Sequence, residues 1–427
     1  MSYVNYPLFL PIAFTIFGFL TALAYSHPLV NKRFGITNVC WILSIFPLIA
    51  FGSLLLALPP IQDGSSLSWQ FYWVQSSIIL GSLYLDNLSA VFALLVTGIG
   101  TLVVIYSGYY FKGDRSAWRF IVYMFLFMSA MLGLVLAGNL VLLFIFWELT
   151  SVTSFLLVAY KYKSDQARKG AFKALLITGA GGVALLLGVV FISSVSGTTE
   201  IATLLTQTAP LQESNLYPFI LIMVALAALT KSAQTPFHIW LPDAMSAPTP
   251  ASAYLHSATM VKAGIYLLAR LNPVLGQTEA WFWIFSSTGL ITMLTGAYLG
   301  LKQNDLKALL AYSTISQLGV MVLLIGQDTD IAFKALIIGV IAHALYKSAL
   351  FLIAGIVDHS TGTRDLRRLG GLGRWMPYSM GIAILAGLSM AGLPPMFGFL
   401  AKETLLATSI HPSLPETISF IFPFGTV

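Results

Sequence analysis

The sequence is poor in charged residues for its length. Charged side chains make up 9% of the 427 residues, whereas a soluble globular domain carries about 25%. Hydrophobic residues account for 57% of the chain, and the mean hydropathy is +0.85. So little charge cannot cover a surface that faces water. The composition therefore predicts an all-α polytopic membrane protein in a lipid bilayer.

Cysteine is almost absent, since Cys40 is the single one and lies in an apolar run. One cysteine excludes a disulfide framework and an iron–sulfur cluster held by this chain alone. No dinucleotide-binding glycine loop is present either. We therefore expect no cofactor and no metal site in this chain. A cleavable signal peptide is also not expected, because the first apolar run begins by Leu8 without a basic leading segment.

Apolar runs long enough to cross a bilayer predict about 12 transmembrane helices. Their expected positions are 7–26, 37–58, 79–110, 118–136, 139–160, 171–194, 217–241, 250–270, 280–301, 306–326, 331–356 and 378–402. Alternation in SLSWQFYWV, within the polar loop at 59–75, predicts a short hairpin at the membrane surface. Prolines predict broken helices at Pro236 and at Pro394–Pro395.

Basic residues are concentrated in alternate loops. Fourteen lysines and arginines lie in loops after odd-numbered runs, and only Arg270 lies in a loop after an even-numbered run. Excess lysine and arginine marks the cytoplasmic side. The distribution predicts a multi-pass protein of the cell membrane with its N-terminus outside. It also accounts for the net charge of +6, so no nucleic-acid partner is expected.

Further ionisable residues lie inside the predicted spans. Such a residue costs roughly 3 kcal/mol on insertion scales, so its presence points to function. Glu148 lies in mid-span and would pair with Lys231 if their spans pack together. His343 and Lys347 are four residues apart and share a helix face. The candidate proton-transfer residues are Glu148, Lys231, His238, His256, Lys262, Lys307, His343, Lys347 and Lys402, with Asp86 and Glu403 as additional candidates.

Simpler explanations exist for these residues when each is taken alone. A lysine near a span end can extend its amine to the interface, which is our interpretation of Lys173 and Lys334. A single histidine can be a satisfied buried group. A row of buried lysines has no such explanation in an inert bundle, and it favours a polar path through the membrane.

The seventh and twelfth runs both break at proline, as TKSAQTPFHIWLP and GLPPMFGFLAKE. They are five runs apart, and an odd offset inverts the orientation in the membrane. This predicts two inverted five-helix repeats with broken helices, the second of them incomplete. The expected domains are 1–117 with the first three helices and the hairpin, 118–270 with the first repeat, and 271–427 with the truncated second repeat.

Three segments identify a family resemblance: FWELTSVTSFLL, TKSAQTPFHIWLPDAMSAPTPASAYLHSATMVKAGIYLLAR and GLPPMFGFLAKE. They resemble the antiporter-like subunits of Mrp-type multisubunit Na⁺/H⁺ antiporters and of respiratory complex I, from about Leu83 to Glu403. Within the family, the lysine in HSATMVKAG makes the sequence most similar to the MrpA-like branch. Family members continue beyond the point where this chain ends, so we expect either a fragment or a subunit completed by another polypeptide.

The resemblance implies a secondary ion transporter, a proton-translocating subunit of a cation/proton (Na⁺/H⁺) antiporter. Its partners would be other membrane subunits of a hetero-oligomeric complex, together with protons and Na⁺. Glu148 and Lys231 would form the input ion pair. A central hydrophilic axis would carry protons to Lys402 through these residues: Lys262, Lys307, His256, His343 and Lys347.

Two alternatives remain open. The first is a proton-pumping membrane subunit of a redox complex of the complex I or membrane-bound hydrogenase type, driven by electron transfer in other subunits. The second is a scaffold with inactive lysines, which the cost of burying charge disfavours. Neighbouring genes would distinguish the first alternative from an antiporter.

Overall fold

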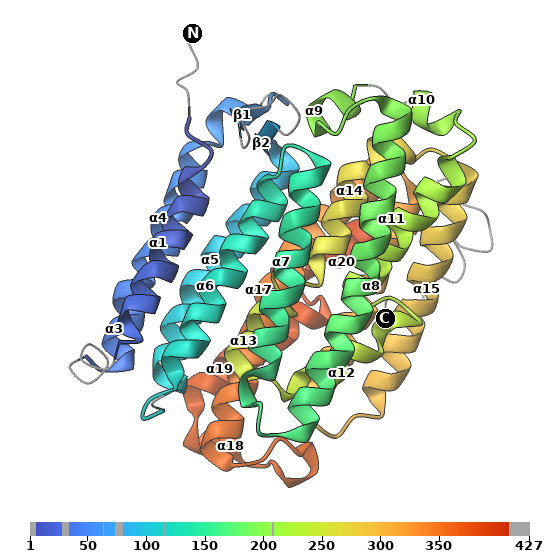
Figure 1. Ribbon diagram of the computed structural model, residues 1–427. Coiled ribbons are helices and arrows are strands. Elements are labelled where there is room, and N and C mark those ends of the chain that lie inside the picture. Colours follow the sequence, from blue (N-terminus) through green and yellow to red (C-terminus); the bar gives the residue numbers. More distant parts are fainter. Residues whose placement is uncertain are drawn as a thin grey trace. The chain divides into compact units, whose positions relative to one another are not determined.

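The computed structural model describes residues 6–27, 34–62, 64–72, 80–114, 116–206 and 209–409. In this part of the chain the regular structure is helical apart from one two-stranded sheet (Figure 1). Eight described helices are long and apolar enough to cross a membrane: Ile36–Leu56, Asn87–Tyr110, Ala117–Leu136, Leu140–Lys161, Asp165–Ser196, Glu279–Leu301, Leu306–Gln327 and Asp330–Thr361. Three apolar helices are shorter: Leu10–Tyr25, Tyr217–Lys231 and Pro377–Ala391. The predicted helical membrane protein is confirmed, while the total of about 12 spans stays a prediction.

The chain divides into two compact units, with boundaries just before α8 (Asp165–Ser196), within α8 and within α11 (Tyr217–Lys231). The first unit comprises Met1–Tyr162 and Leu175–Ala227. Its elements are α1 (Leu10–Tyr25), α3 (Ile36–Leu43), α4 (Ile45–Leu56), η1 (Pro59–Ile61), β1 (Leu67–Tyr72), β2 (Leu80–Leu85), α5 (Asn87–Tyr110), α6 (Ala117–Leu136), α7 (Leu140–Val158), η2 (Ala159–Lys161), most of α8 (Asp165–Ser196), α9 (Ile201–Leu204), α10 (Ala209–Gln212) and most of α11 (Tyr217–Lys231). Helix α6 is the core of this unit, because it packs against α1, α5 and α7 and buries nearly all its residues after Tyr123.

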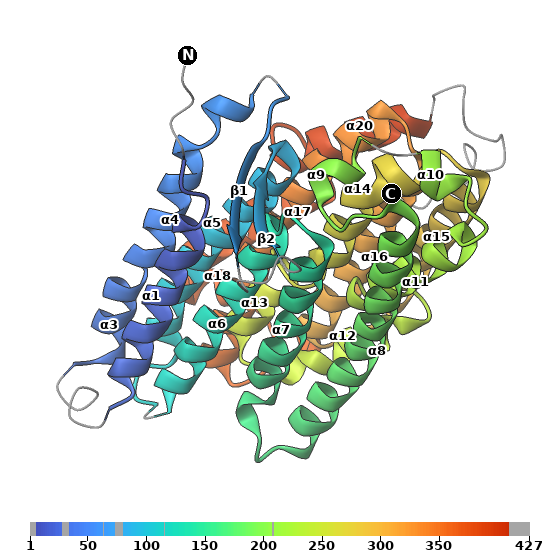
Figure 2. The same cartoon turned by 45° about the horizontal axis from the view of Figure 1, so that its top comes forward.

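A hairpin is present, but only its first strand lies in the loop at 59–75 where it was predicted, and its turn lies outside the described residues. Strands β1 and β2 pair antiparallel, with Leu67 opposite Leu85, and Figure 2 shows them side by side. The expected helix at 79–110 is therefore wrong over Leu80–Leu85. Helix α5 starts only at Asn87, because Asp86 accepts a hydrogen bond from the Ser89 amide at 2.9 Å and its own amide donates to Ser89 Oγ at 2.9 Å. This reciprocal capping box fixes the start of the helix.

Hydrogen bonds connect strand β2 to other elements of the first unit. The Gly138 amide donates to the carbonyl oxygen of Ser82 at 2.7 Å, and Ser82 Oγ donates to Glu200 Oε2 at 2.6 Å. These bonds join the strand to the α6–α7 turn and to the segment after α8. The backbone groups of an apolar strand are thereby satisfied without a helix.

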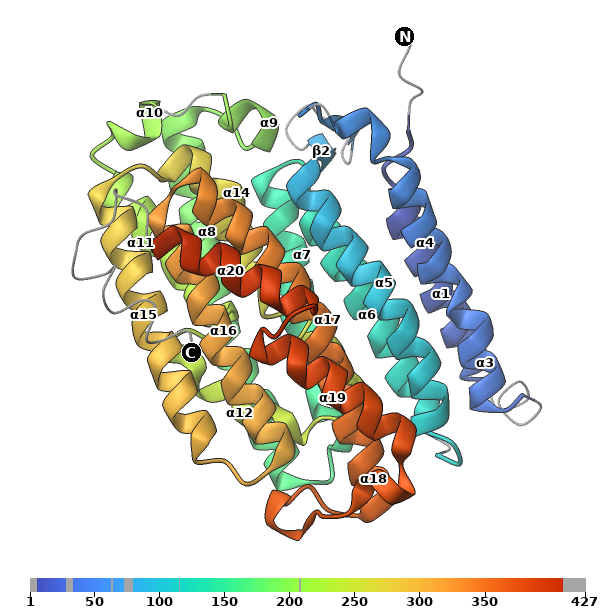
Figure 3. The ribbon, with the colours of Figure 1, turned by 180° about the vertical axis from the view of Figure 1, so that it is seen from behind.

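The second unit comprises Lys163–Ala174 and Ala228–Val427. Beyond the ends of α8 and α11, its elements are η3 (Phe237–Ile239), α12 (Trp240–Asp243), η4 (Ala244–Ser246), α13 (Thr249–Leu255), α14 (Lys262–Leu275), α15 (Glu279–Leu301), α16 (Leu306–Gln327), α17 (Asp330–Thr361), η5 (Leu366–Arg368), α18 (Leu372–Trp375), α19 (Pro377–Ala391) and α20 (Phe397–Ser409). Helix α17 contacts α13, α16, α19 and α20. Figure 3 shows α17 from behind, together with α16, α19 and α20. Helix α15 packs on α16 instead.

Three helices of the second unit are broken, and two of the breaks agree with the prolines. Helix α11 stops at Lys231, not near residue 241 as expected, and short turns continue from Pro236. Helix α19 ends at Ala391 and α20 begins at Phe397, with Pro394–Pro395 between them. The segment expected to span at 250–270 is not one continuous helix, because α13 ends at Leu255 and α14 begins at Lys262.

Helices α15 and α16 pack backbone to backbone. A Cβ atom built on Gly289 would lie 2.7 Å from the carbonyl oxygen of Gly319, and one on Gly319 would lie 2.7 Å from the carbonyl oxygen of Gly289. A Cβ on Gly326 would lie 2.5 Å from the Ser286 amide nitrogen. Small residues allow membrane helices to approach this closely. We call this contact the α15–α16 seam.

The loop before α16 and the loop after α17 form a short ladder. The Leu306 amide donates to the carbonyl oxygen of Arg364 at 3.0 Å, and the Leu366 amide donates to that of Asn304 at 2.9 Å. Arg364 also pairs with Asp305, with 3.1 Å between Nε and Oδ2. Asp305 caps α16 by accepting from the Ala308 amide at 3.0 Å. The ladder therefore holds the first turn of α16 in place.

Candidate proton-transfer site

Lys262 is the first residue of α14 and is fully buried. Its Nζ donates a hydrogen bond to the carbonyl oxygen of Val340, in the middle of α17, at 2.8 Å. His343 and Lys347 follow Val340 at offsets of three and seven residues, which places all three on one face of α17. The break before α14 thus brings a lysine to the polar face of α17.

His343 and Lys347 are also fully buried. The ring of His343 lies near the backbone of Ser257 and interacts electrostatically with Lys262 and Lys347. Lys347 Nζ donates to Ser313 Oγ on α16 and makes a long contact of 3.5 Å with the carbonyl oxygen of Leu310. The contacts of Lys262 and Lys347 within the described residues are with neutral oxygen atoms. Neither amine has a carboxylate partner there.

A second group lies around the end of α13. His256 follows α13 directly and is fully buried, and neither of its ring nitrogens has a hydrogen-bond partner among the described residues. Lys307, in the first turn of α16, is 2% exposed and donates to the carbonyl oxygen of Ala247 at 3.0 Å. It is close enough to His256 to interact with it electrostatically. A bond of 2.9 Å between the hydroxyls of Ser257 and Ser348 connects this group to α17.

Lys231 ends α11 and is fully buried. The next residue, Ser232, donates from Oγ to the carbonyl oxygen of Val261 at 2.7 Å, immediately before Lys262. Gly264 makes this approach possible, because a Cβ there would overlap the carbonyl oxygen of Ala228. The end of α11 and the start of α14 are therefore adjacent, and each carries a buried lysine.

Glu148 lies on α7 in the first unit and is half-buried. Its carboxylate faces Gly182 of α8, where an added Cβ would overlap Oε1. Lys231 belongs to the other unit, so the pairing of Glu148 with Lys231 stays a prediction.

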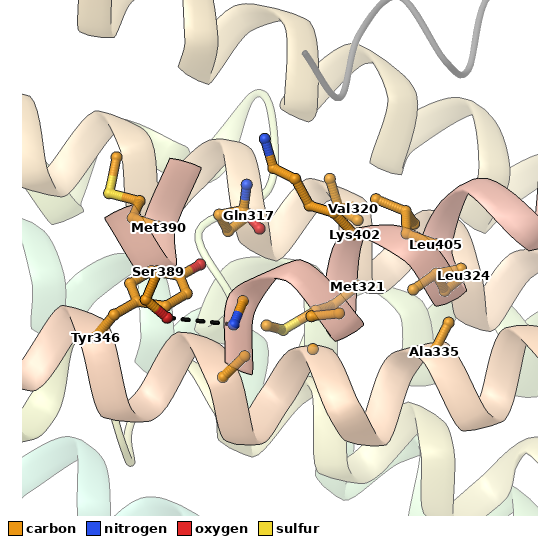
Figure 4. A pocket seen from close by; sticks show the side chains of 14 residues that line it. Gln317, Val320, Met321, Leu324, Ala335, Tyr346, Ser389, Met390, Lys402 and Leu405 are labelled. Atoms are coloured by element: carbon orange, nitrogen blue, oxygen red, sulfur yellow. Dashed lines mark hydrogen bonds between the residues drawn. The ribbon is translucent and has the colours of Figure 1, made fainter. Parts of the chain in front are cut away.

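Lys402 and Glu403 lie on α20. Lys402 is half-buried and lines a pocket between α16, α17, α19 and α20, together with Gln317, Tyr346 and Ser389 (Figure 4). Figure 4 also shows the bond of 3.2 Å from the Gly398 amide to Ser389 Oγ, which connects the two sides of the proline break. Glu403 is exposed. Among the described residues, no hydrogen bond joins Lys402 to the lysines on α14, α16 or α17.

The remaining candidates lie apart from these groups. His238 is half-buried in η3, beside the exposed Pro236, and its Nδ1 has no hydrogen-bond partner among the described residues. Asp86 forms the capping box of α5, which gives its carboxylate a structural role. The structure does not connect Asp86 to the buried lysines.

The positions of two basic residues, Lys173 and Arg270, were not expected. Lys173 is paired with Asp243 of α12, and both side chains are about half-exposed at 42% and 45%. The sequence does not reveal this pair, since its members are 70 positions apart. Arg270 was expected in a loop, which is wrong: it lies within α14 and is only 3% exposed. No group of three metal-ligating side chains occurs within the described residues.

The fold and the site define a polytopic membrane protein that buries lysines and histidines around broken helices. Residues 137–426 match the family described as NADH:quinone oxidoreductase/Mrp antiporter, transmembrane region. Residues 73–121 match the N-terminal region of chain 5 of NADH-ubiquinone oxidoreductase (complex I). The chain belongs to the NADH:quinone oxidoreductase/Mrp antiporter family of membrane proteins.

Named relatives cover most of this chain. It is 45% identical to the A/B subunit of a probable K⁺/H⁺ antiporter of Rhizobium meliloti over 90% of this chain and 39% of the relative. It is 44% identical to the A subunit of the Na⁺/H⁺ antiporter of Alkalihalophilus pseudofirmus over 95% of this chain and 53% of the relative. The chain thus spans about half the length, or less, of these curated relatives.

Two solved structures share the fold. A chain of the Mrp complex from Dietzia sp. superposes with a TM-score of 0.87 at 38% identity, covering 98% of this chain and 45% of that one. A chain of the membrane-bound sulfane sulfur reductase, an archaeal respiratory membrane complex, superposes with a TM-score of 0.83 at 20% identity. The alignment covers 98% of this chain and 85% of that chain, and at this identity the likeness concerns the fold alone.

Proposed function

We propose that this chain is a proton-translocating subunit of a multisubunit cation/proton antiporter of the Mrp type. The names of the relatives from Rhizobium meliloti and Alkalihalophilus pseudofirmus support this proposal, since they specify K⁺/H⁺ and Na⁺/H⁺ antiport. Na⁺ or K⁺ is the exchanged cation, and the partners are other membrane subunits of the complex. The N-terminus faces outward, as the distribution of basic loop residues predicts.

The contact between Lys262 and Val340 carries the proposal. A buried ammonium with a permanent charge is stabilised by a carboxylate in an ion pair. Lys262 and Lys347 instead donate to neutral oxygens within the described residues. Such an environment suits an amine that alternates between charged and neutral forms. Histidine accepts and releases protons more readily than any other side chain near neutral pH, and His343 lies between the two lysines on the polar face of α17.

In the proposed route, protons move between the lysines and histidines of the second unit. Lys262, His343 and Lys347 exchange protons along α17, and Lys307 and His256 extend the path toward the break at the end of α13. Glu148 and Lys231 form the input pair, and Lys402 is at the far end. The order rests on the shared helix face and on the bond from Ser257 to Ser348.

The finer architecture belongs to the same proposal. The helices form two inverted five-helix repeats among about 12 spans, with the α11 and α19–α20 breaks at corresponding positions. Pro236 follows the end of α11, and Pro394–Pro395 lie between α19 and α20. Broken helices in matching positions are typical of ion pathways in transporters, which supports this architecture.

A variant of Lys262 tests the function in the purified complete assembly. The assembly is reconstituted into vesicles that contain a pH-sensitive dye, and Na⁺ or K⁺ is added to dissipate an imposed pH gradient. We expect cation-dependent proton movement in the wild type. Lys262→Met should assemble normally, because methionine fills the buried volume without a charge, and should lose the movement.

Lys334→Ala is the matched control, since Lys334 is an exposed lysine on α17. Its exchange should equal that of the wild type. A wild-type assembly that moves no protons in response to either cation would refute antiport. Normal exchange by Lys262→Met would remove Lys262 from the route.

A further inference from the structure

Helix α14 carries a polar stripe that starts at Lys262 and includes two residues that the proposed route does not use. Lys262, Tyr266 and Arg270 recur every four residues, so they lie on one side of the helix. Their exposed fractions are 0%, 1% and 3%. Arg270 lies eight residues after Lys262, which corresponds to about 12 Å along the helix axis. We call these three residues the α14 stripe.

The members of the stripe are joined at its far end. Nε and Nη2 of Arg270 each donate to the hydroxyl oxygen of Tyr266 at 3.2 Å. The guanidinium carbon lies 5.3 Å from the centre of the Tyr266 ring. The arginine therefore covers the hydroxyl on the side away from Lys262.

Further polar side chains lie after Arg270, at the C-terminal end of α14. Asn272 Nδ2 donates to Asp328 Oδ1 at 2.9 Å, and the Gln277 amide donates to the other carboxylate oxygen of Asp328. Asp328 is partly exposed. Gln327 is 6% exposed, and neither polar atom of its side chain has a hydrogen-bond partner among the described residues. Polar side chains therefore lie around the C-terminal end of α14, and one of them, Asp328, is partly exposed at the surface.

The chemistry of the stripe changes at Arg270. A tyrosine hydroxyl both donates and accepts, so it can pass a proton onward. A guanidinium has no acceptor and keeps its proton at every physiological pH. A fixed positive charge in a membrane protein also raises the electrostatic barrier to protons. Tyr266 can therefore extend a path from Lys262, and Arg270 ends it.

We propose that Arg270 is a fixed-charge barrier that keeps protons on Lys262 from escaping through the C-terminal end of α14. The proposal rests on the proposed function, because it takes Lys262 as a proton carrier. Arg270 does not carry protons itself. Its charge prevents protons from leaving the route along the α14 stripe.

Proton leak through the complete assembly tests this barrier without any transported cation. Vesicles in choline buffer, with neither Na⁺ nor K⁺, receive an imposed pH gradient, and its decay is followed. Arg270→Gln should increase the decay rate by about tenfold, the effect of one charge at this separation in a protein interior. Arg270→Lys retains the charge, so the pH gradient should decay as slowly as in the wild type.

Removing the Tyr266 hydroxyl shows whether Arg270 acts as a proton barrier or only supports the packing. In the double variant Arg270→Gln/Tyr266→Phe the hydroxyl is gone, so the leak should return to the wild-type rate. A defect in packing would not be repaired by a second substitution. Tyr266→Phe alone should leave cation-dependent exchange unchanged, because the branch is closed. If Arg270→Gln does not assemble, Arg270→Met removes the charge with a better fit to an apolar surrounding.

Three results would overturn the proposal: no increased leak in the uncharged variants, a leak that persists without the Tyr266 hydroxyl, or slower exchange in Tyr266→Phe. The last would make the stripe a working exit. A failure of the proposed function can be distinguished from a failure of the barrier. In the first case the wild-type assembly exchanges no cation, whereas the leak through the barrier is measured without Na⁺ or K⁺.

Discussion

Lys262 Nζ donates to the carbonyl oxygen of Val340 across 2.8 Å, one turn before His343 on the same face of α17. The bond joins the first residue of α14 to the middle of another helix. It depends on the break at 256–261, since a continuous helix would not begin at this lysine. The position of the break is thus as important for the site as the lysine itself.

Gly182 offers a way to test Glu148 without removing its charge. Gly182→Ala places a methyl group where Oε1 of Glu148 lies, so the carboxylate has to move. We expect exchange to fall by about tenfold or more, since a small misplacement near reacting groups has large effects. Gly179→Ala, also on α8, is the matched control, because a Cβ there meets no atom within 4 Å.

The same vesicle assay reports on both glycine variants and on Glu148→Ala. Glu148→Ala should assemble and transport nothing. Equal exchange rates in Gly182→Ala, Glu148→Ala and wild type would exclude the carboxylate from the mechanism.

Lys231→Arg separates a proton carrier from a fixed charge. Lys231 is fully buried at the end of α11, and arginine would preserve its charge but would not release a proton, since its pKa stays above about 12. We expect an assembled complex with no cation-dependent proton movement. Near-normal antiport in this variant would show that the residue acts only through its charge.

Asp86→Ala should affect stability more than transport. Loss of the cap on α5 costs about 1 kcal/mol, which thermal unfolding of the purified assembly would detect as a lower midpoint. Exchange per assembled complex should be unchanged. A stable Asp86→Ala complex that no longer exchanges would instead place Asp86 in the proton route.

Asp365 gives a prediction about pH at the loop ladder. Hydrogen bonds from Arg367 lower the pKa of Asp365 from its ordinary value of 3.8 to about 2. The carboxylate therefore stabilises the folded protein above its ordinary pKa, and this contribution disappears as the pH falls from about 4 to 2. Asp365→Asn should lower the unfolding midpoint by a constant amount between about pH 5 and 8, and the difference from wild type should shrink below about pH 4.

Thermal unfolding of both proteins across this pH range checks the prediction. Asp330→Asn, at the start of α17, is a carboxylate control away from the ladder. A wild-type advantage that persists undiminished at pH 2 would assign the effect of Asp365→Asn to something other than its charge.

The helix breaks differ in how far the sequence predicts them. Pro236 and Pro394–Pro395 indicate their breaks directly, because proline has no amide hydrogen to donate and disrupts a helix. The break between α13 and α14 contains neither proline nor glycine. There Thr259 Oγ1 donates to the carbonyl oxygen of Tyr254 at 2.8 Å. The Ala258 amide also donates to this carbonyl oxygen at 3.3 Å, so the hydroxyl is a second donor at the end of α13. No local composition reveals this arrangement.

The other features could not be predicted from the sequence because they depend on tertiary contacts. The apolar run around Leu80–Leu85 is equally compatible with a helix, and it becomes a strand because β1 is available as a partner. The types of residue in the site are predictable from the cost of burying charge. Their partners are not, since Lys262 and Val340 are 78 residues apart and Arg270 acquires its significance only from Tyr266 in three dimensions.

The α15–α16 seam has a consequence for motion. With no side chains between the backbones of Gly289 and Gly319, sliding one helix along the other would drive carbonyl and amide groups into side chains. We therefore expect α15 and α16 to move as a single rigid element during transport. Any conformational change that accompanies ion exchange would then be taken up by the broken helices, where Lys231 and Lys262 lie.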